Sequence, residues 1–422
     1  MKKYANIKST KQKGETTMTA ILHHILYKFV AILISVPMLL GINIDLLKAD
    51  DTNWNTNYPY VFVHGLSGWG SYDDIYKIMP YWGMFGGELM GYLEDKGFHA
   101  YAASVAPTDS AWDRACELYA QLTGTKVDYG KAHSERCNHK RYGEDFTGRA
   151  LIPSFSETDK INLLGHSFGG ATVRLFASIM EKGAAEEIAA TPADELSDYF
   201  KGGKGGWIYS VTSLAAPHNG TSAYNTGEGT EEKEPEPEKE EKSNIIKDAF
   251  GNLANKMMSQ FTGGEKDGRI DSDYAAYDMY IDNALELNKT IVTYKDTYYF
   301  SFACTATTKN EDGTYSPDKK IMEGIYSASS EEIGRYTGVT KGGFVIDETW
   351  MENDGLVNTV SALAPSSAPN AQYEAGNVQK GIWYTMPIIY GDHMCLQGGM
   401  TKINDVKNFY TEHLSMINSL SK

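Results

Sequence analysis

Cysteine is scarce in this sequence. Four cysteines, Cys116, Cys137, Cys304 and Cys395, stand among 422 residues and form no CxxC pair. Their number and spacing exclude a small disulfide-stapled scaffold and a paired-thiol motif. Because four separated cysteines are compatible with either a reducing or an oxidising environment, they leave the cellular compartment open.

Basic residues are also few relative to acidic ones. Lysine and arginine number 39 against 55 aspartate and glutamate residues, which gives a formal net charge of −16. Binding to nucleic acid needs a basic surface that faces the phosphates, and no basic stripe compensates for the acidic balance. The sequence therefore excludes nucleic acid as an expected partner.

The mean hydropathy of the chain is negative, which excludes a polytopic membrane protein. Hydrophobic residues nevertheless make up 41% of the chain and aromatic residues 12%, enough for a large core. A chain of 422 residues has room for one enlarged domain or for two ordinary ones. We expect a single domain over residues 50–422.

The N-terminal segment differs from the rest of the chain. Five lysines lie within the first 13 residues, ahead of an apolar stretch that runs from Phe29 to Leu47. This order of a basic region and an apolar region is typical of an export signal, although Leu47-Lys48-Ala49 offers only a weak cleavage site. Residues 1–49 are predicted to be a signal peptide of a secreted protein, with an uncleaved membrane anchor as the alternative.

Short apolar runs alternate with helical patterns along the main part of the chain. The runs are predicted to be buried parallel strands, at Tyr58–His64, Lys160–Gly165, Ile208–Ala215 and Tyr298–Ala303. Helices are predicted between them, at Glu88–Lys96, Trp112–Leu122 and Gly170–Glu181. This alternation indicates an α/β fold with a mostly parallel central sheet.

The middle of the chain carries a charged run. Residues 227–242 read GEGTEEKEPEPEKEEK, which cannot bury apolar surface and is predicted to be a disordered acidic insertion. Apolar residues then recur at helical spacing over residues 245–263. This amphipathic helix either packs on the core or forms a mobile lid over an apolar site. Its place beside the acidic insertion favours the lid.

A GHSFG run at residues 165–169 follows the second predicted strand and opens a helix. A serine on such a turn needs glycine neighbours, because larger side chains would collide with the adjacent strand and helix. In this context Ser167 is predicted to be a nucleophile rather than part of a simple tight turn. Acyl transfer also needs two backbone N–H donors for its oxyanion. Phe168, which follows the serine, and Leu66, in the turn after the first strand, are the predicted donors.

The base of a catalytic triad is expected downstream of Ser167, because the triad residues of α/β-hydrolases follow the order serine, acid, histidine. His218 precedes any suitable acid loop, and His413 falls within a C-terminal helical pattern. His393, which follows an apolar strand-like run, is therefore the predicted base. His64 stays open as an alternative base, although a histidine at a strand end is more often a structural hydrogen-bonding group.

The acid is expected between the nucleophile and the base. The run WMENDGLV over residues 350–357 places Asp354 in a turn next to a glycine. Asp354 is predicted to hold the imidazole in the tautomer that can accept the serine proton. Asp392 and Glu352 remain alternative acids.

Four segments of the sequence resemble the Gram-positive true lipases of thermoalkalophilic and staphylococcal type. These segments are YPYVFVHGLSGWG, INLLGHSFGGATVR, SVTSLAAPHNGT and WMENDGLVN, and the resemblance spans residues 58–420. It implies an α/β-hydrolase fold with a helical lid, and a serine esterase active in lipid degradation. It also supports Ser167, Asp354 and His393 as the triad and the backbone N–H groups of Leu66 and Phe168 as oxyanion donors.

The resemblance further implies a structural zinc ion in an insertion beside the lid. In the family two aspartates and two histidines bind this ion, and the matching segments point to Asp113, His133, His139 and Asp273. Their spacing alone is weak evidence, because zinc ligands usually have closer spacing signatures. A closed set of two nitrogen and two oxygen ligands is nevertheless typical of structural zinc. Cys137, between the two histidines, is a competing soft ligand.

Calcium is not expected. In the family, acidic residues follow the catalytic histidine by a few positions, whereas residues 394–400 contain none. Calcium prefers several hard oxygen ligands. The resemblance to the lipases therefore predicts zinc but not calcium.

The expected substrate is an acylglycerol ester at an oil–water or membrane interface, because an apolar helix over the site suits water-insoluble acyl chains. A phospholipase or a short-chain carboxylesterase is the alternative enzyme. A catalytically inert, surface-anchored binding module on a hydrolase fold is the alternative from another class. The sequence leaves the oligomeric state open.

Overall fold

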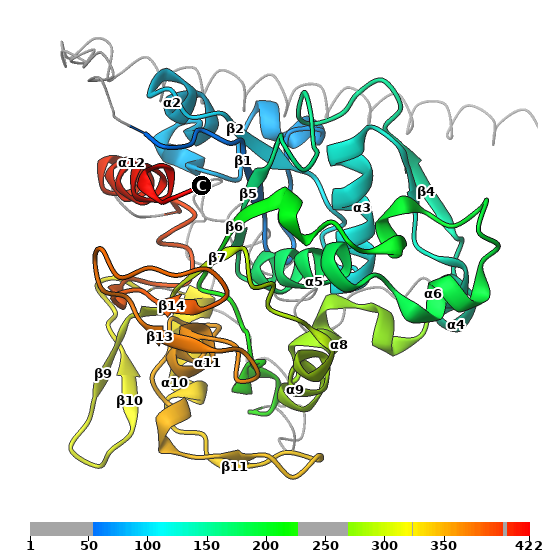
Figure 1. Ribbon diagram of the computed structural model, residues 1–422. Coiled ribbons are helices and arrows are strands. Elements are labelled where there is room, and N and C mark those ends of the chain that lie inside the picture. Colours follow the sequence, from blue (N-terminus) through cyan, green and yellow to red (C-terminus); the bar gives the residue numbers. More distant parts are fainter. Residues whose placement is uncertain (1–53, 227–268, 323, 400–402) are drawn as a thin grey trace, which may run out of the picture. The chain divides into compact units, whose positions relative to one another are not determined.

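A sheet of seven parallel strands forms the centre of the part of the chain that the structure describes (Figure 1). The computed structural model describes residues 54–226, 269–322, 324–399 and 403–422. The strand order is β13-β14-β7-β6-β5-β1-β2. The strands are β1 Tyr60–Val63, β2 Ala100–Ala103, β5 Ile161–His166, β6 Ile208–Leu214, β7 Tyr298–Phe302, β13 Asn370–Gln372 and β14 Trp383–Thr385.

Helices cover both faces of this sheet, which explains why strands β1, β5, β6 and β7 are buried at every position. Side chains of a strand alternate between the two faces. In β1, Val61 and Val63 pack in one cluster with α3 Ala111–Thr123 and α5 Phe168–Lys182. The other side chains of β1 pack in a second cluster with α2 Leu89–Asp95 and α12 Ile403–Ser419. Each fully buried side chain of this size stabilises the fold by about 1.5–3 kcal/mol.

Smaller elements surround the central sheet. The remaining helices are α4 Lys131–Cys137, α6 Ala185–Ala190, α8 Ala275–Met279, α9 Ile281–Thr290, α10 Gly324–Ile333 and α11 Thr359–Leu363. Two-stranded sheets pair β3 Lys126–Asp128 with β4 Tyr142–Asp145, β8 Cys304–Thr305 with β15 Ile389–Tyr390, β9 Thr307–Lys309 with β10 Tyr315–Pro317, and β11 Gly338–Val339 with β12 Val345–Ile346. Short 3-10 helices are η1 Asp74–Lys77, η2 Met84–Gly86, η3 Asp198–Lys201, η4 Gly205–Trp207, η5 Ser222–Tyr224, η6 Asp271–Asp273 and η7 Glu348–Trp350.

The predicted α/β class with a mostly parallel central sheet is confirmed. The four predicted strands correspond to β1, β5, β6 and β7, and the three predicted helices to α2, α3 and α5. Three regions with predictions lie outside the described residues: the export segment 1–49, the acidic insertion 227–242 and the lid helix 245–263. Among the helices that the structure describes, none has both the length and the apolar character needed to cross a membrane.

The parallel arrangement brings the predicted site residues to one edge of the sheet. The carboxyl ends of β1 and β5 are neighbours, because Val63 pairs with Gly165. Leu66 lies in the turn after β1, and Ser167 directly follows β5. Ligands of open α/β sheets bind outside the carboxyl ends of the strands, so a substrate site is expected at this edge.

Candidate active site and metal centre

Ser167 occupies the tight turn between β5 and α5. Its backbone has φ 55° and ψ −129°, a conformation that costs a residue other than glycine about 1–3 kcal/mol. Glycine is required on both sides: a Cβ at Gly165 would lie 2.3 Å from the carbonyl oxygen of Gly169, and one at Gly169 would lie 2.3 Å from that of Val63. The Ser167 N–H donates to the carbonyl oxygen of Leu214 at 2.8 Å. These contacts fix Ser167 at the carboxyl edge of the sheet.

Ser167, His393 and Asp354 form a continuous line of hydrogen bonds. Ser167 Oγ lies 2.8 Å from His393 Nε2, and His393 Nδ1 lies 2.9 Å from Asp354 Oδ2. Because a carboxylate only accepts hydrogen bonds, Nδ1 carries the imidazole proton and Nε2 accepts the serine hydroxyl. The exposed fractions of the three residues are 9%, 2% and 1% in the same order. This arrangement is suited to nucleophilic attack by the serine, with a histidine base and an orienting acid.

Backbone hydrogen bonds hold the acid and the base in place. Asp354 Oδ1 accepts from the N–H groups of Leu356 and Val357 at 3.1 and 2.8 Å. Gly355 has a φ of 109°, which glycine adopts without strain. The backbone N–H of His393 donates to the carbonyl oxygen of Asp354 at 2.8 Å. The contact between the two side chains is therefore supported by a second contact between their backbones.

The other downstream histidines are engaged elsewhere. His218 Nε2 lies 2.7 Å from Ser213 Oγ, and His413 Nε2 lies 2.9 Å from Thr212 Oγ1. Burial lowers the pKa of His413 to about 3 and that of His218 well below its usual value. Both are buried neutral groups in the fold, and His393 is the downstream histidine that the structure places against the nucleophile.

The carboxylates of the alternative acids, Asp392 and Glu352, make no hydrogen bond to the imidazole of His393 within the described part of the chain. Asp392 Oδ1 accepts from the backbone N–H of Met394 at 3.1 Å, and burial raises the pKa of Asp392 to about 6. Glu352 is half-buried, and its backbone carbonyl accepts the N–H of Thr359. Of the three candidate acids, Asp354 is the one whose carboxylate contacts His393.

The loop after β1 lies directly against Ser167. A Cβ at Gly65 would lie 2.7 Å from Ser167 Cβ and 3.3 Å from Ser167 Oγ. Within the described part of the chain, no protein group accepts a hydrogen bond from the backbone N–H of Leu66. Phe168 is the first residue of α5, where backbone N–H groups lack helical partners and carry partial positive charge. The positions of both predicted oxyanion donors suit contact with a substrate bound at Ser167.

A buried guanidinium, which the sequence analysis did not identify, supports this loop. Arg114 on α3 donates through Nη2 to the carbonyl oxygen of His64 and through Nη1 to that of Ala106, the latter at 3.0 Å. Its Nε donates to Thr172 Oγ1 on α5 at 3.0 Å. Burial lowers the pKa of Arg114 to about 10, so it stays charged at neutral pH. Arg114 therefore ties two helices to the loop behind the nucleophile.

His64, the alternative base, uses both ring nitrogens on the backbone. Its Nδ1 donates to the carbonyl oxygen of Gly65 at 2.8 Å, and its Nε2 accepts from the N–H of Val105 at 3.3 Å. Burial, followed by the charge of Arg114, lowers the pKa of His64 to about 3. The contacts of His64 are those of a neutral histidine that shapes the turn after β1.

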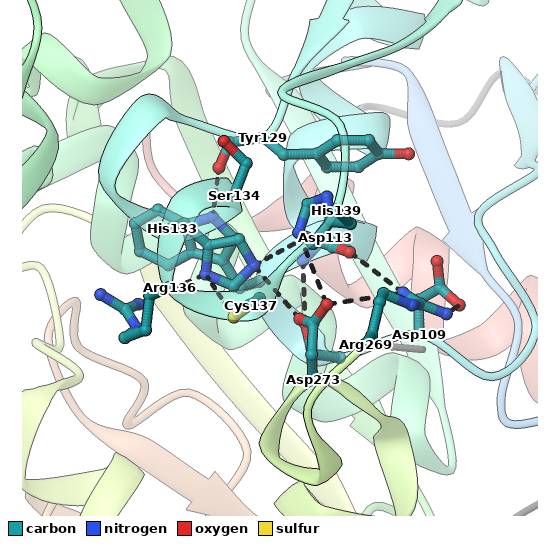
Figure 2. A network of polar contacts seen from close by, with 12 residues as sticks. Asp109, Asp113, Tyr129, His133, Ser134, Arg136, Cys137, His139, Arg269 and Asp273 are labelled. Carbon is teal, nitrogen blue, oxygen red and sulfur yellow. Dashed lines mark hydrogen bonds and ion pairs between the residues drawn. The ribbon is translucent and has the colours of Figure 1, made fainter. Parts of the chain in front are cut away.

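The four predicted zinc ligands converge at a second site (Figure 2). Asp113 lies on α3, His133 on α4, His139 just after α4, and Asp273 on η6. His133 Nε2 lies 3.0 Å from Asp113 Oδ1 and 3.2 Å from Asp273 Oδ1. His139 Nε2 lies 3.5 Å from Asp273 Oδ2 and 3.8 Å from Asp113 Oδ1. These residues can hold a metal ion, because two imidazole nitrogens and two carboxylates face one point.

Three atoms of this cluster are buried without a hydrogen-bond partner among the described residues. They are Asp113 Oδ1, His139 Nε2 and Asp273 Oδ2. Their only polar contacts among these residues are the ion-pair contacts given above, and a cation between them would bind them directly. Arg269 Nη1 lies 3.4 Å from Asp113 Oδ2 and 3.6 Å from Asp273 Oδ2 (Figure 2), so the protein balances part of the carboxylate charge itself. The chemistry of the cluster fits a bound cation.

Cys137 borders the cluster on another side of His133. One ligand atom each from His133, Cys137, His139 and Asp273 lies within 4.8 Å of the others. The thiol, however, is 3.8 Å from His133 Nδ1, whereas both carboxylates face Nε2 of the same ring. Since one imidazole presents one nitrogen to a given ion, the geometry at Nε2 favours Asp113 over Cys137 as the fourth ligand.

Neighbouring groups orient the ligands, and the sequence analysis did not identify them. Ser110 Oγ donates to Asp273 Oδ1 at 3.0 Å. The buried carboxylate of Glu187 accepts the backbone N–H of His133 at 2.7 Å and so caps the first turn of α4. Trp112 stacks on the imidazole of His133, with ring centroids 5.2 Å apart. Such outer contacts fix the rotamers of metal ligands and raise the affinity of a site.

The sequences of known proteins extend this picture. The family described as "Lipase-like, C-terminal domain" matches residues 56–233 and 264–420. Lipase 2 of Staphylococcus aureus is 32% identical over 388 residues, which cover 86% of this chain and 54% of that protein. The lipase of Staphylococcus hyicus is 30% identical over 365 residues, which cover 79% and 53%. The chain thus spans about half the length of the curated relatives it matches.

Solved structures agree with the sequence relatives. EstA from Clostridium botulinum is 30% identical with a TM-score of 0.74, and the match covers 88% of this chain and 90% of that one. The Staphylococcus hyicus lipase is 27% identical with a TM-score of 0.69, covering 86% and 97%. Lipase 1 from Pelosinus fermentans is 32% identical with a TM-score of 0.66, covering 85% and 98%. The resemblance to staphylococcal lipases is confirmed, and the chain belongs to the lipase-like C-terminal domain family.

Proposed function

We propose that the protein is a secreted lipase that hydrolyses the carboxylic ester bonds of acylglycerols with Ser167, His393 and Asp354 as its triad. The observation that carries the proposal is the line of hydrogen bonds from Ser167 Oγ through both imidazole nitrogens to the Asp354 carboxylate. The names of its relatives support ester hydrolysis. The basic and apolar pattern of residues 1–49 supports export.

Acylation begins when Ser167 Oγ attacks the ester carbonyl carbon. His393 Nε2 accepts the hydroxyl proton, and the Asp354 carboxylate stabilises the resulting imidazolium. The oxygen of the tetrahedral intermediate accepts hydrogen bonds from the backbone N–H groups of Leu66 and Phe168. The intermediate then collapses, the alcohol leaves with the proton from His393, and the acyl group stays on Ser167.

Deacylation repeats these steps with water as the nucleophile. His393 Nε2 accepts a proton from the attacking water, and the same two backbone donors stabilise the second oxyanion. Collapse of this intermediate breaks the bond between the acyl carbon and Ser167 Oγ. Ser167 recovers its proton from His393, and the fatty acid is released.

Replacement of the nucleophile tests this proposal. A Ser167→Ala variant is expected to lose nearly all hydrolysis of p-nitrophenyl esters and all labelling by a fluorophosphonate probe. Ser419→Ala, at the exposed end of α12, is the matched control and is expected to behave as the wild type. Hydrolysis by Ser167→Ala at the wild-type rate would refute the triad, and a folded wild type that the probe does not label would favour an inert binding module.

The choice of acylglycerols as substrate is tested separately. We expect rates on a series of glycerides to rise with acyl-chain length and to increase when the substrate forms an emulsified interface. A preference for soluble butyrate esters without a gain at the interface would instead assign a short-chain carboxylesterase. Faster release of fatty acid from phospholipid vesicles than from glycerides would assign a phospholipase.

We further propose that Asp113, His133, His139 and Asp273 hold a structural zinc ion. The two-nitrogen, two-oxygen donor set and the unpaired buried atoms among these residues support this assignment. When bound, the ion would supply folding stability by joining α3, α4 and η6. Elemental analysis of dialysed protein is expected to give about one zinc per chain, the content of a closed four-ligand site. Asp273→Asn should lower this content, and zinc-free wild type prepared without chelator would disprove the assignment.

A further inference from the structure

A buried chain of hydrogen bonds joins the loop after β1 to His393 through Tyr81 and His166. The backbone N–H of Gly65 donates to the Tyr81 hydroxyl oxygen at 3.1 Å. The same oxygen lies 2.7 Å from His166 Nδ1, and His166 Nε2 lies 2.8 Å from the carbonyl oxygen of His393. The exposed fractions of Tyr81 and His166 are 2% and 0%. The chain is therefore shielded from water along its length.

A single arrangement of protons satisfies every bond in this chain. The His393 carbonyl only accepts, so His166 Nε2 carries a proton. In a neutral imidazole Nδ1 is then unprotonated and accepts from the Tyr81 hydroxyl. The hydroxyl oxygen is left to accept the N–H of Gly65. The three bonds thus run in one direction, from Gly65 to His393.

Burial maintains this arrangement. It lowers the pKa of His166 to about 3, with a further contribution from His393, so His166 stays neutral at the pH at which an ester hydrolase works. It also raises the pKa of the Tyr81 hydroxyl, which therefore keeps its proton. The Tyr81 ring packs edge-on against Trp69 and Trp82, with centroids 5.6 and 5.3 Å away. The hydroxyl consequently has a fixed position.

Each end of the chain is next to a group of the proposed mechanism. Gly65 lies against Ser167 and precedes Leu66, the proposed oxyanion donor. His166 immediately precedes Ser167, and His393 is the proposed base. The backbone of His393 is also held at its N–H by the Asp354 carbonyl. The hydrogen bond from His166 thus holds the carbonyl group of His393, which is the other polar group of its backbone.

We propose that Tyr81 and His166 are positioning residues that hold the oxyanion loop, the nucleophile turn and the base in one fixed relation. This inference rests on the proposed function, because it assigns to the two residues an effect on the reaction of Ser167. Neither residue contacts Ser167 Oγ or the imidazole nitrogens of His393 through a hydrogen bond in the described structure. Their effect is on geometry, and misplacement of a catalytic group by about 1 Å can lower a rate about 100-fold.

Three variants test the proposal through the reaction of Ser167 with a fluorophosphonate. Tyr81→Phe removes the hydroxyl and keeps the ring. His166→Leu removes the donor to His393, whereas His166→Gln keeps an amide N–H that can replace it. Tyr60→Phe is the matched control, because its hydroxyl is also buried and hydrogen-bonds to α12, at Asn418 Oδ1 and the carbonyl oxygen of Leu414, away from Ser167.

Two quantities are measured for each protein. The end-point of labelling gives the fraction of chains with an intact site. The rate constant with which labelling approaches that end-point gives the reactivity of those sites. Tyr81→Phe and His166→Leu are expected to react about 10- to 100-fold more slowly, with KM for a soluble ester within about twofold of wild type because substrate contacts are untouched. His166→Gln should recover at least tenfold of the loss seen in His166→Leu, and Tyr60→Phe should react at the wild-type rate.

The outcomes separate this inference from the function on which it rests. Wild-type rate constants for Tyr81→Phe and His166→Leu would overturn the positioning role while Ser167 labelling still supported the hydrolase. An equal loss in Tyr60→Phe, or no recovery in His166→Gln, would also overturn it, since a nonspecific disturbance of the folded core would then explain the slower reaction. A wild type that is not labelled at Ser167 would instead contradict the proposed function. A partly unfolded variant still gives a rate constant, because the rate is measured on the labelled fraction alone.

Discussion

Replacing Asp354 with asparagine removes one charge while keeping the shape of the side chain. In wild type, the N–H groups of Leu356 and Val357 donate to Asp354 Oδ1, and the amide oxygen of the asparagine can still accept them. The group that faces His393 Nδ1 becomes an NH2 donor. Nδ1 must then accept, the imidazole proton moves to Nε2, and Nε2 can no longer take the proton of Ser167.

The size of the loss follows from the distance between the two side chains. Unit charges 2.9 Å apart interact by about 6 kcal/mol at an effective dielectric constant of about 20. An imidazolium stabilised by this amount in the transition state corresponds to a rate factor of about 10⁴, at about 1.4 kcal/mol per tenfold. The aspartate-to-asparagine change in the triad of a serine protease costs about the same factor. We therefore expect kcat of Asp354→Asn to fall about 10⁴-fold.

The assay is turnover of a soluble p-nitrophenyl ester, with urea unfolding as the check on folding. Asp392→Asn is the matched control, because its carboxylate is the next residue to His393 but bonds to the backbone of Met394. We expect the control to keep its activity within about tenfold, since a charge without direct contact acts weakly. A loss below about 100-fold in a folded Asp354→Asn, or equal losses in both variants, would show that Asp354 is not the orienting acid.

Three further predictions concern stability. Burial raises the pKa of Asp392 to about 6, so the folded state binds this proton more tightly than the unfolded state does. Between about pH 4 and about pH 6, urea unfolding should therefore show wild type losing up to about 3 kcal/mol more stability than Asp392→Asn. Gly169→Ala, whose Cβ would meet the Val63 carbonyl oxygen at 2.3 Å, should destabilise the protein by at least about 1–3 kcal/mol, whereas Gly206→Ala, whose nearest neighbour is 3.9 Å away, should not. A zinc chelator should lower Tm by several degrees, because ligands that bind the folded state stabilise it, while a calcium-selective chelator should leave Tm unchanged. A lower Tm with the calcium-selective chelator alone would assign the site to calcium.

The tight turn at Ser167 could be predicted from the sequence because its constraints are local. The turn after β5 requires glycine at Gly165 and Gly169, where a side chain would meet backbone atoms, and this requirement is visible as a five-residue pattern. The order of residues along the chain then pointed to Asp354 and His393. By contrast, β2, Ala100–Ala103, was not predicted, since its sequence AYAA lacks β-branched residues and its strand conformation depends on pairing with β1.

The supporting groups could not be predicted because they act across long sequence distances. Tyr81 reaches His166, and Arg114 reaches the turn at His64, only once the sheet has formed. The choice between Asp113 and Cys137 at the metal cluster depends on which imidazole nitrogen each one faces. That property follows from side-chain rotamers and the packing of α3 against α4, neither of which residue spacing reveals.

The first turn of α3 has a consequence for engineering the protein. Asp113 and Arg114 are consecutive residues, yet one belongs to the metal cluster and the other holds the carbonyl groups behind the nucleophile. A substitution that shifts this turn displaces both, so with the proposed zinc site and function we expect heat resistance and turnover to change together there. Mutant libraries that aim at heat resistance should keep residues 110–114 as one block, because no residue of α3 is exposed.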